Sequence, residues 1–375
     1  MSTTGNPWIR SRGIGRLLAH ETNISDIIQL LSDRDCTPWN RLVGFVPTDL
    51  QREVKNANNA DLLLTSPERT AIIEVKLGHL MDRAQQKKYE DLASSPTLFL
   101  AALRSDEVRL ELDSDMWTFL SLSDIISSWK TSDDEFARLL AAEAASVLDS
   151  WDALIAGVFS DRSSEARAPL SGLNQKFLGR VVGRRIARDL RERGRLAFAG
   201  VTSGGGLPLI AAWSPIRNGD EYSTFIAEIR WWGDKPGGEL RFGVDFETPP
   251  GQQEDEDIRR AAYDLARSMD AEITHDGLSA FFAREYPHLN TLLSRTRSSR
   301  PKPRGDWEQV IAHGFEGARL ASGKKNSRRQ TKPDFYGDGT LRFQAITEIN
   351  FAEASAIDAT NIMDATLDYL ISHQP

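Results

Sequence analysis

The sequence predicts an α/β protein with two domains, an αβββαβ core at the N-terminus and an α+β domain at the C-terminus. Three observations lead to this prediction. The chain has 375 residues, which is enough for two domains of ordinary size. Its first part alternates between helix-type and strand-type hydrophobic periodicity. A polar stretch at residues 160–171, rich in Ser, Arg and Pro, reads as a linker and is followed by several strand-type segments in succession. The predicted domains are therefore residues 1–159 and 172–375.

The first predicted domain opens with a helix over Ile14–Leu31, where apolar residues recur every three or four positions. Short apolar runs then predict strands, and two longer periodic segments predict helices. The strands are expected at Arg41–Val46, Asn59–Thr65, Thr70–Leu77, Thr97–Leu103 and Met116–Leu122, and the helices at Gly78–Ala93 and Asp133–Phe159. The first six elements thus follow the order helix, three strands, helix, strand.

The second predicted domain combines a large set of strands with flanking helices. The strands are expected at Leu196–Ser203, Leu207–Trp213, Tyr222–Trp232, Glu239–Glu247 and Leu341–Phe351, and the helices at Leu173–Arg193, Asp255–Ile273 and Ala354–Ile371. In Glu239–Glu247 apolar and charged residues alternate strictly, which predicts a sheet with one buried face and one face in water.

The composition excludes several classes of protein. Charged residues make up 27% and hydrophobic residues 40% of the chain, which are globular values. The longest clean apolar run is Leu98–Leu103, far below the roughly 18 residues that a membrane helix needs. No secretory signal follows the N-terminus, and the single cysteine, Cys36, excludes an intrachain disulfide and a cysteine zinc site. We therefore expect a cytoplasmic protein with no part in a membrane.

The residues that suggest chemistry lie in the hairpin predicted around Ser66–Arg69. If this hairpin is symmetric about its turn, Asp61 lies opposite Glu74, with Cβ atoms roughly 4.5–5.5 Å apart. Lys76 shares a face with Glu74 because side chains alternate along a strand. Two carboxylates this close require a nearby positive charge, for which a divalent metal ion and Lys76 are both candidates.

The flanking helices add three polar residues to this hairpin. Glu21 lies within the apolar stripe of the first helix, where a carboxylate is costly unless it is paired or binds a metal. Gln85 and Tyr89 are four residues apart on the next helix, so both side chains are expected to lean toward the hairpin.

This arrangement resembles the PD-(D/E)XK nuclease superfamily, which has the restriction-endonuclease-like fold. The residues that carry the resemblance are Asp61, then Glu74-Val75-Lys76, then Gln85 and Tyr89. The segment that begins Glu21-Thr22-Asn23 is similar to a first-helix motif of prokaryotic branches. The resemblance covers about residues 14–130, and Ala60 stands where the family motif has proline.

The resemblance implies a role for each of these residues. Asp61, Glu74 and the carbonyl of Val75 would hold Mg²⁺ or Mn²⁺, and Glu21 would bind a metal water or a second ion. Lys76 would position or deprotonate the attacking water, or stabilise the charge of the transition state. Gln85 and Tyr89 would orient the site or contact the phosphate backbone.

The implied function is metal-dependent hydrolysis of DNA phosphodiester bonds, with RNA not excluded, in prokaryotic antiviral defence or DNA processing. The alternative is a non-catalytic nucleic-acid-binding or assembly protein that keeps the nuclease fold. The second domain would contact substrate, form homo-oligomers or bind partner subunits.

Two local clusters of positive charge stand out because the net charge of the chain is −8. Arg180–Arg195 contains seven arginines, and Arg295–Lys332 contains 11 basic and 3 acidic residues. Such patches permit a polyanionic partner. For the first cluster, contact with DNA and a simply solvated helix face both remain open.

Overall fold

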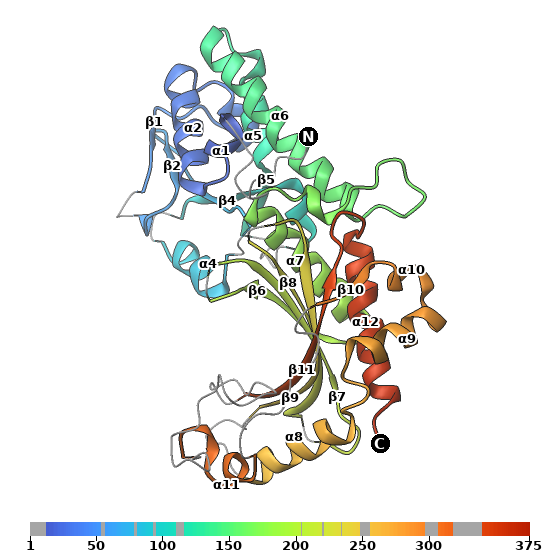
Figure 1. The fold of residues 1–375 in the computed structure, drawn as a ribbon. Coiled ribbons are helices and arrows are strands. Elements are labelled where there is room, and N and C mark those ends of the chain that lie inside the picture. The colour runs from blue at the N-terminus through green and yellow to red at the C-terminus, as the bar shows by residue number, and fades with distance from the viewer. Residues whose placement is uncertain are drawn as a thin grey trace. The chain divides into compact units, whose positions relative to one another are not determined.

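A computed structural model describes residues 13–53, 57–78, 81–92, 95–109, 116–203, 205–219, 221–233, 235–247, 256–296, 307–317 and 340–375. Contacts within the chain divide these residues into two compact units. The N-terminal unit holds residues 13–157 and 173–182, and the C-terminal unit holds residues 158–172 and 183–375. The protein is thus of mixed α/β class, with one sheet in each unit (Figure 1).

The sheet of the N-terminal unit has five strands in the order β1-β2-β3-β4-β5. The strands are β1 (Asp49–Gln51), β2 (Leu62–Thr65), β3 (Thr70–Val75), β4 (Thr97–Ala102) and β5 (Trp117–Ser121). The first three are antiparallel neighbours, whereas β3, β4 and β5 run parallel. The central strand β3 is buried from Ala71 to Val75, as expected of a strand covered on both faces.

The register of the β2–β3 hairpin is the one that the sequence predicts. Leu62 pairs with Ile73 and Thr65 with Thr70 on either side of the turn. Within the turn, the backbone N–H of Ser66 donates to the carbonyl of Arg69 at 2.8 Å. This register brings Asp61, directly before β2, to the level of Glu74 in β3.

Six α-helices accompany this sheet in the described part of the chain. They are α1 (Ile14–Leu17), α2 (Glu21–Arg34), α3 (Trp39–Val43), α4 (Arg83–Glu90), α5 (Leu122–Ser127) and α6 (Glu135–Val158), with short 3₁₀ helices at Arg104–Arg109 and Ser128–Thr131. The strands predicted at Asn59–Thr65, Thr70–Leu77, Thr97–Leu103 and Met116–Leu122 are present with slightly shorter bounds, and Asp133–Phe159 forms the single helix α6.

Two predicted elements of this unit differ from the structure. The helix expected over Ile14–Leu31 is interrupted between Leu17 and Glu21, where the carbonyl of Leu17 accepts from the backbone N–H of His20 at 3.4 Å and from the side-chain amide of Asn23 at 3.0 Å. The strand expected at Arg41–Val46 is instead the helix α3, which ends at Gly44 in the left-handed conformation. Trp39 in α3 is fully buried, and its indole N–H donates to the Ser32 hydroxyl at 2.8 Å. These contacts favour a helix over the strand that the composition of Arg41–Val46 predicts.

The helix predicted at Gly78–Ala93 begins later than expected. Gly78 has φ +74°, and Asp82 caps α4 by accepting from the backbone N–H of Gln85 at 2.7 Å. A left-handed residue stops the chain from continuing β3 directly into a helix, so α4 starts only at Arg83.

The C-terminal unit is built on a six-stranded antiparallel sheet in the order β10-β11-β9-β8-β7-β6. Its strands are β6 (Leu196–Val201), β7 (Pro208–Pro215), β8 (Ser223–Trp231), β9 (Gly238–Glu247), β10 (Leu293–Arg295) and β11 (Thr340–Ile349). The helices that occur here are α7 (Lys176–Glu192), which spans the boundary between the units, α8 (Glu256–Ser268), α9 (His275–Glu285), α10 (Pro287–Asn290), α11 (Trp307–Gly317) and α12 (Ala356–Ser372), with a 3₁₀ helix at Leu170–Gly172.

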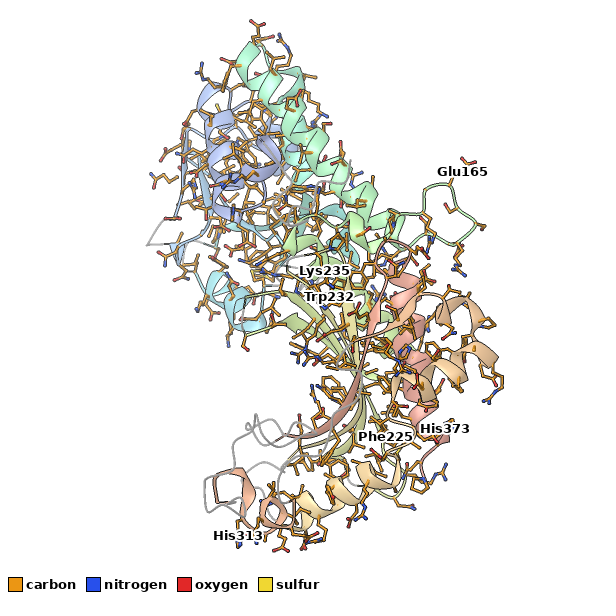
Figure 2. The ribbon with its side chains drawn as sticks, viewed as in Figure 1. Glu165, Phe225, Trp232, Lys235, His313 and His373 are labelled. Atoms are coloured by element: carbon orange, nitrogen blue, oxygen red, sulfur yellow. The ribbon has the colours of Figure 1, made fainter. Side chains whose placement is uncertain are left out.

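The five strands and three helices predicted for this region are present, and four further elements, α9, α10, β10 and α11, were not predicted. The helix expected over Asp255–Ile273 ends at Ser268, and Asp255 lies outside the described residues. The apolar face of the sheet carries Phe225, which is fully buried (Figure 2). Beyond the end of β8, Lys235 Nζ lies 3.9 Å from the centroid of the Trp232 ring (Figure 2).

The alternation in Glu239–Glu247 predicts that the charged face of this sheet is exposed to water, but two carboxylates on that face are buried. Asp245 is 1% and Glu228 is 4% exposed. Arg342 on the neighbouring strand donates to Asp245 Oδ2 at 2.9 Å and to Glu228 Oε2 at 3.2 Å. Arginine pairing therefore permits carboxylates to be buried where the sequence pattern indicates water.

Among the described residues, no helix has both the length and the apolar character that crossing a membrane requires.

We predict that Gly78→Ala destabilises the protein by about 2–4 kcal/mol. The new Cβ would lie 2.8 Å from Phe177 Cβ, and the left-handed φ of +74° is itself unfavourable for alanine. Gly194→Ala is the matched control, because Gly194 has φ +86° but no atom within 4 Å of the new Cβ. It should cost only about 1 kcal/mol. Equal losses in urea unfolding would contradict the close packing at Gly78.

Candidate functional site

The candidate site lies where β3 ends, and its core is the trio Asp61, Glu74 and Lys76. Lys76 Nζ lies 2.5 Å from Glu74 Oε1. Asp61 Oδ2 accepts a hydrogen bond from the backbone N–H of Val75 at 2.8 Å. The hairpin register and the alternation along β3 therefore bring together the three residues that the sequence singles out.

Glu74 is the centre of this arrangement. The amide of Gln85 donates to Glu74 Oε1 at 2.6 Å, and the hydroxyl of Tyr89 donates to Glu74 Oε2 at 2.8 Å. Both donors come from α4, and the cap at Asp82 sets where this helix begins and so which of its side chains face β3. Glu74 is only 3% exposed, so these donors and Lys76 replace the water that its carboxylate would otherwise bind.

The apolar surroundings fix the position of this polar group. Ile72 precedes Glu74 on the same face of β3 and packs with Tyr89 and Leu100 in one buried cluster. Within this cluster the ring of Tyr89 meets Trp117 edge to face, with centroids 6.0 Å apart. Tyr89 thus presents its hydroxyl to Glu74 while its ring is held by apolar contacts.

Glu21 reaches the same end of β3 from the first turn of α2. Its Oε1 accepts from the backbone N–H of Leu77 at 2.6 Å. This bond explains how a carboxylate can occupy an apolar stripe, because it pairs Glu21 with a backbone donor. The sequence did not indicate a role for the Leu77 N–H or for Asp82, although an aspartate directly before a helix is a recognisable cap.

The charges in the site perturb one another. Burial, reinforced by the negative charge of Glu74, raises the pKa of Asp61 to about 6. Burial alone would lower the pKa of Lys76, but Glu74, Glu21 and Asp61 outweigh it, so the pKa of Lys76 is raised. Burial and the charge of Glu74 also raise the pKa of Tyr89. Lys76 and Tyr89 are therefore held in their protonated forms.

The donor set suits a hard divalent cation in part. Asp61 and Glu74 offer carboxylate oxygens, and burial and the charge of Glu74 raise the pKa of Asp61, so a cation would relieve the cost of ionising it. In the part of the chain that the structure describes, no three Asp, Glu, His or Cys side chains lie close enough to hold a metal ion. Mg²⁺ requires only one or two carboxylates when waters and phosphate complete its shell.

Some arginines of the first basic cluster pair with carboxylates. Arg188 pairs with Glu192 at 2.7 Å, and Arg195 pairs with Asp364 of α12 at 2.8 Å. Arg180 and Arg184 are half-buried in α7. In the second cluster, residues 297–306 and 318–339 lie outside the described residues.

Comparisons with known proteins identify no relative, since no family model, no curated protein and no solved structure matches this chain.

We predict that Asp61→Asn stabilises the metal-free protein above pH 6. The raised pKa means that a protonated Asp61 favours the folded state, and this contribution is lost as the pH rises through about 6. Asparagine keeps an acceptor for the Val75 N–H without the buried charge. The gain should approach about 2 kcal/mol at pH 8 and shrink toward pH 4.5 in denaturant unfolding with EDTA.

The control for this experiment is Asp91→Asn, which removes an exposed carboxylate at the end of the same helix α4. It should leave stability nearly unchanged at both pH values. A pH-independent gain from Asp61→Asn would show that the charge of Asp61 is not the cause.

Proposed function

We propose that the protein is a Mg²⁺- or Mn²⁺-dependent nuclease that hydrolyses phosphodiester bonds of DNA. The observation that carries the proposal is the meeting of Asp61, Glu74 and Lys76 at one end of β3. Two carboxylates and an ammonium group at that spacing are the residue types that metal-assisted phosphodiester hydrolysis requires.

The helix–strand order of the N-terminal unit supports the same proposal. Its sheet has a central hairpin, β2–β3, followed by α4 and a parallel strand, β4, which agrees with the restriction-endonuclease-like core that the motif implies. Glu74 lies in β3, and Gln85 and Tyr89 lie in α4. Asp61 and Lys76 adjoin the ends of β2 and β3. We extend the proposal to a cytoplasmic role in prokaryotic defence or DNA processing, with RNA as a second possible substrate.

In the proposed reaction Asp61, Glu74 and the carbonyl of Val75 would hold the metal ion. Such an ion would supply Lewis-acid polarisation of a phosphoryl oxygen and a water of lowered pKa. Glu74 would exchange a hydrogen bond from Lys76 or Gln85 for this ligand role. Glu21 accepts from the Leu77 N–H and would add negative charge to the site.

Lys76 is best suited to stabilise charge. Its raised pKa keeps the ammonium protonated at neutral pH, so it is a poor proton acceptor. A protonated lysine beside the scissile phosphate would neutralise the negative charge that develops in the transition state. Among the roles that the sequence left open for Lys76, we therefore propose charge stabilisation.

One observation favours the non-catalytic alternative. Glu74 already accepts from Lys76, Gln85 and Tyr89, which is a complete set of partners for a buried structural carboxylate. In that case the polar cluster would serve folding alone, in a protein that binds nucleic acid or assembles with partners without cleaving.

We predict that the purified protein cleaves DNA with Mg²⁺ or Mn²⁺ and is inactive in EDTA. Asp61→Ala and Glu74→Ala should each abolish cleavage, because each removes a proposed metal ligand. Supercoiled plasmid, linear duplex, single-stranded DNA and single-stranded RNA should be compared. Asp91→Ala is the matched control and should cleave normally, since Asp91 is an exposed carboxylate at the end of α4.

The alternative makes the opposite prediction for this experiment. Absence of metal-dependent cleavage of every substrate by folded wild-type protein would favour it. Cleavage that survives in both Asp61→Ala and Glu74→Ala would instead place the active site elsewhere.

We predict that Lys76→Ala lowers single-turnover cleavage by about 10²-fold or more, as expected when a charge-stabilising group is lost. DNA affinity measured in Ca²⁺ should change much less. Because the proposed role is charge and not proton abstraction, Lys76→Arg should recover part of the rate, and the pH profile should keep its shape. A collapse of affinity with an unchanged rate for bound substrate would reduce Lys76 to a phosphate anchor.

A further inference from the structure

The strand β6 leaves an apolar surface open at the end of the C-terminal sheet. The structure describes nine large hydrophobic residues as exposed, and three of them lie on this one strand of six residues. Leu196 is 62%, Phe198 57% and Val201 46% exposed. Leu196 and Phe198 share one face of the strand, whereas Val201 lies on the other. The exposed pair Leu196 and Phe198 on an edge strand indicates an interaction surface.

The backbone of β6 has hydrogen-bonding groups that face away from the sheet. The N–H of Thr202 donates to the carbonyl of Leu207 on the β7 side. Successive residues of an antiparallel strand point their backbone N–H and C=O groups to opposite edges. Since Thr202 faces β7, Ala197, Ala199 and Val201 direct these groups toward the other edge. The Ala197 carbonyl accepts from Arg191 at 3.2 Å, which confirms this direction for Ala197.

The sequence of β6 lacks the usual protection of an edge strand. Leu196–Val201 reads LAFAGV and contains no charged residue and no proline. Edge strands that must avoid pairing normally carry a charge, a proline or a bulge. The free edge of β6 is therefore suited to accept another strand.

The side chains near this edge offer two places where apolar side chains of a partner strand could pack. The ring of Phe198 lies against Gly200, where an added Cβ would come within 2.5 Å of Phe198 Cε1. At the other end of β6, Leu196 lines a cavity of about 350 Å³ together with Trp213 and Tyr222. A partner strand could place one apolar side chain on Phe198 and another in this cavity.

The charge beside this edge identifies the chemistry of the partner. Arg184, Arg188 and Arg191 share one face of α7, and Arg191 reaches the edge itself. Residues 183–195 contain six arginines, Asp189 and Glu192, and Asp364 and Asp368 of α12 pair with Arg193 and Arg195. Six positive and four negative charges leave a net charge of +2, which favours acidic residues.

A second copy of the chain fits this edge poorly. Pairing β6 with itself would bring two arginine-bearing α7 faces together, and like charges at short range oppose association. Nucleic acid would use the arginines but not the N–H and C=O groups that face away from β7. The cavity is also lined by Glu221 and Glu247, which disfavour a polyanion on that side.

We propose that β6 binds an extended segment of a partner protein by adding it as a further strand. The segment carries apolar residues on the side of Leu196 and Phe198 and carboxylates on the side of α7. This surface lies entirely within the C-terminal unit, so the proposal does not depend on the nuclease function.

The test uses the full chain and a fluorescein-labelled, end-capped peptide of eight residues in which valine and glutamate alternate. We expect saturable binding by fluorescence anisotropy. A peptide with lysine in place of glutamate, and one N-methylated at two consecutive central residues, should bind at least tenfold more weakly. The first loses the charge match, and the second loses a backbone donor on each edge.

Variants of the chain locate the binding site. Phe198→Ala and Arg191→Glu should each weaken binding by about tenfold. Leu139→Ala is the control, since Leu139 is 60% exposed but lies on α6. Ala199→Pro should abolish binding by removing an edge N–H, and thermal melting shows whether this variant stays folded.

Several results would overturn the proposal. These are no saturable binding to the valine–glutamate peptide, equal binding of the N-methylated peptide, or an unchanged affinity in both Phe198→Ala and Arg191→Glu. Competition by a (dT)₁₂ oligonucleotide that is lost in the same two variants would assign the surface to nucleic acid. Concentration-dependent dimers that are lost in Phe198→Ala would assign it to a second copy.

Discussion

The burial of the Glu74 carboxylate within the central strand of the N-terminal sheet constrains everything around it. A charge at that depth is tolerable only if donors replace its lost hydration. Lys76, Gln85 and Tyr89 are these donors, and each of them requires a particular feature of the fold. Lys76 requires β3 to keep its alternation to the strand end, while Gln85 and Tyr89 require α4 to be capped and aligned over the same face. The position of the polar cluster therefore depends on how β3 and α4 pack, and that packing depends in turn on the hydrogen bonds of the cluster.

The same constraint recurs in the C-terminal sheet, where Arg342 allows Asp245 and Glu228 to be buried. The two clusters differ in the net charge that remains after these ion pairs form. In the sheet of the C-terminal unit Arg342 bridges Asp245 and Glu228. Arg230 also pairs with Glu228, so two arginines match two carboxylates. At β3 a single lysine faces three carboxylates, and burial together with the negative charge of Glu74 raises the pKa of Asp61. An excess of buried negative charge, as at β3, would be relieved by an added cation.

The hairpin and its polar residues could be predicted because they depend on local rules. A turn of known length fixes the register, and the register fixes which side chains share a face. The helix α3 could not be predicted from Arg41–Val46, because its stability comes from burying Trp39 in a distant part of the core. At the interruption before α2, the Asn23 side chain donates to the Leu17 carbonyl, a contact that hydrophobic periodicity does not show. Burial of Asp245 depends on Arg342, almost one hundred residues away, which no periodic pattern reveals.

The helix α7 limits how the chain can be divided. Its first turns belong to the N-terminal unit, where the ring of Phe177 packs on Trp151 with centroids 4.8 Å apart, and its later turns belong to the C-terminal unit. A fragment ending in the polar stretch at residues 160–171 would lose Phe177 and expose both Trp151 and the backbone turn at Gly78. Residues beyond the apparent linker therefore complete the first folding unit. An isolated N-terminal fragment should extend through Val182, and the C-terminal remainder would then lack the start of its helix.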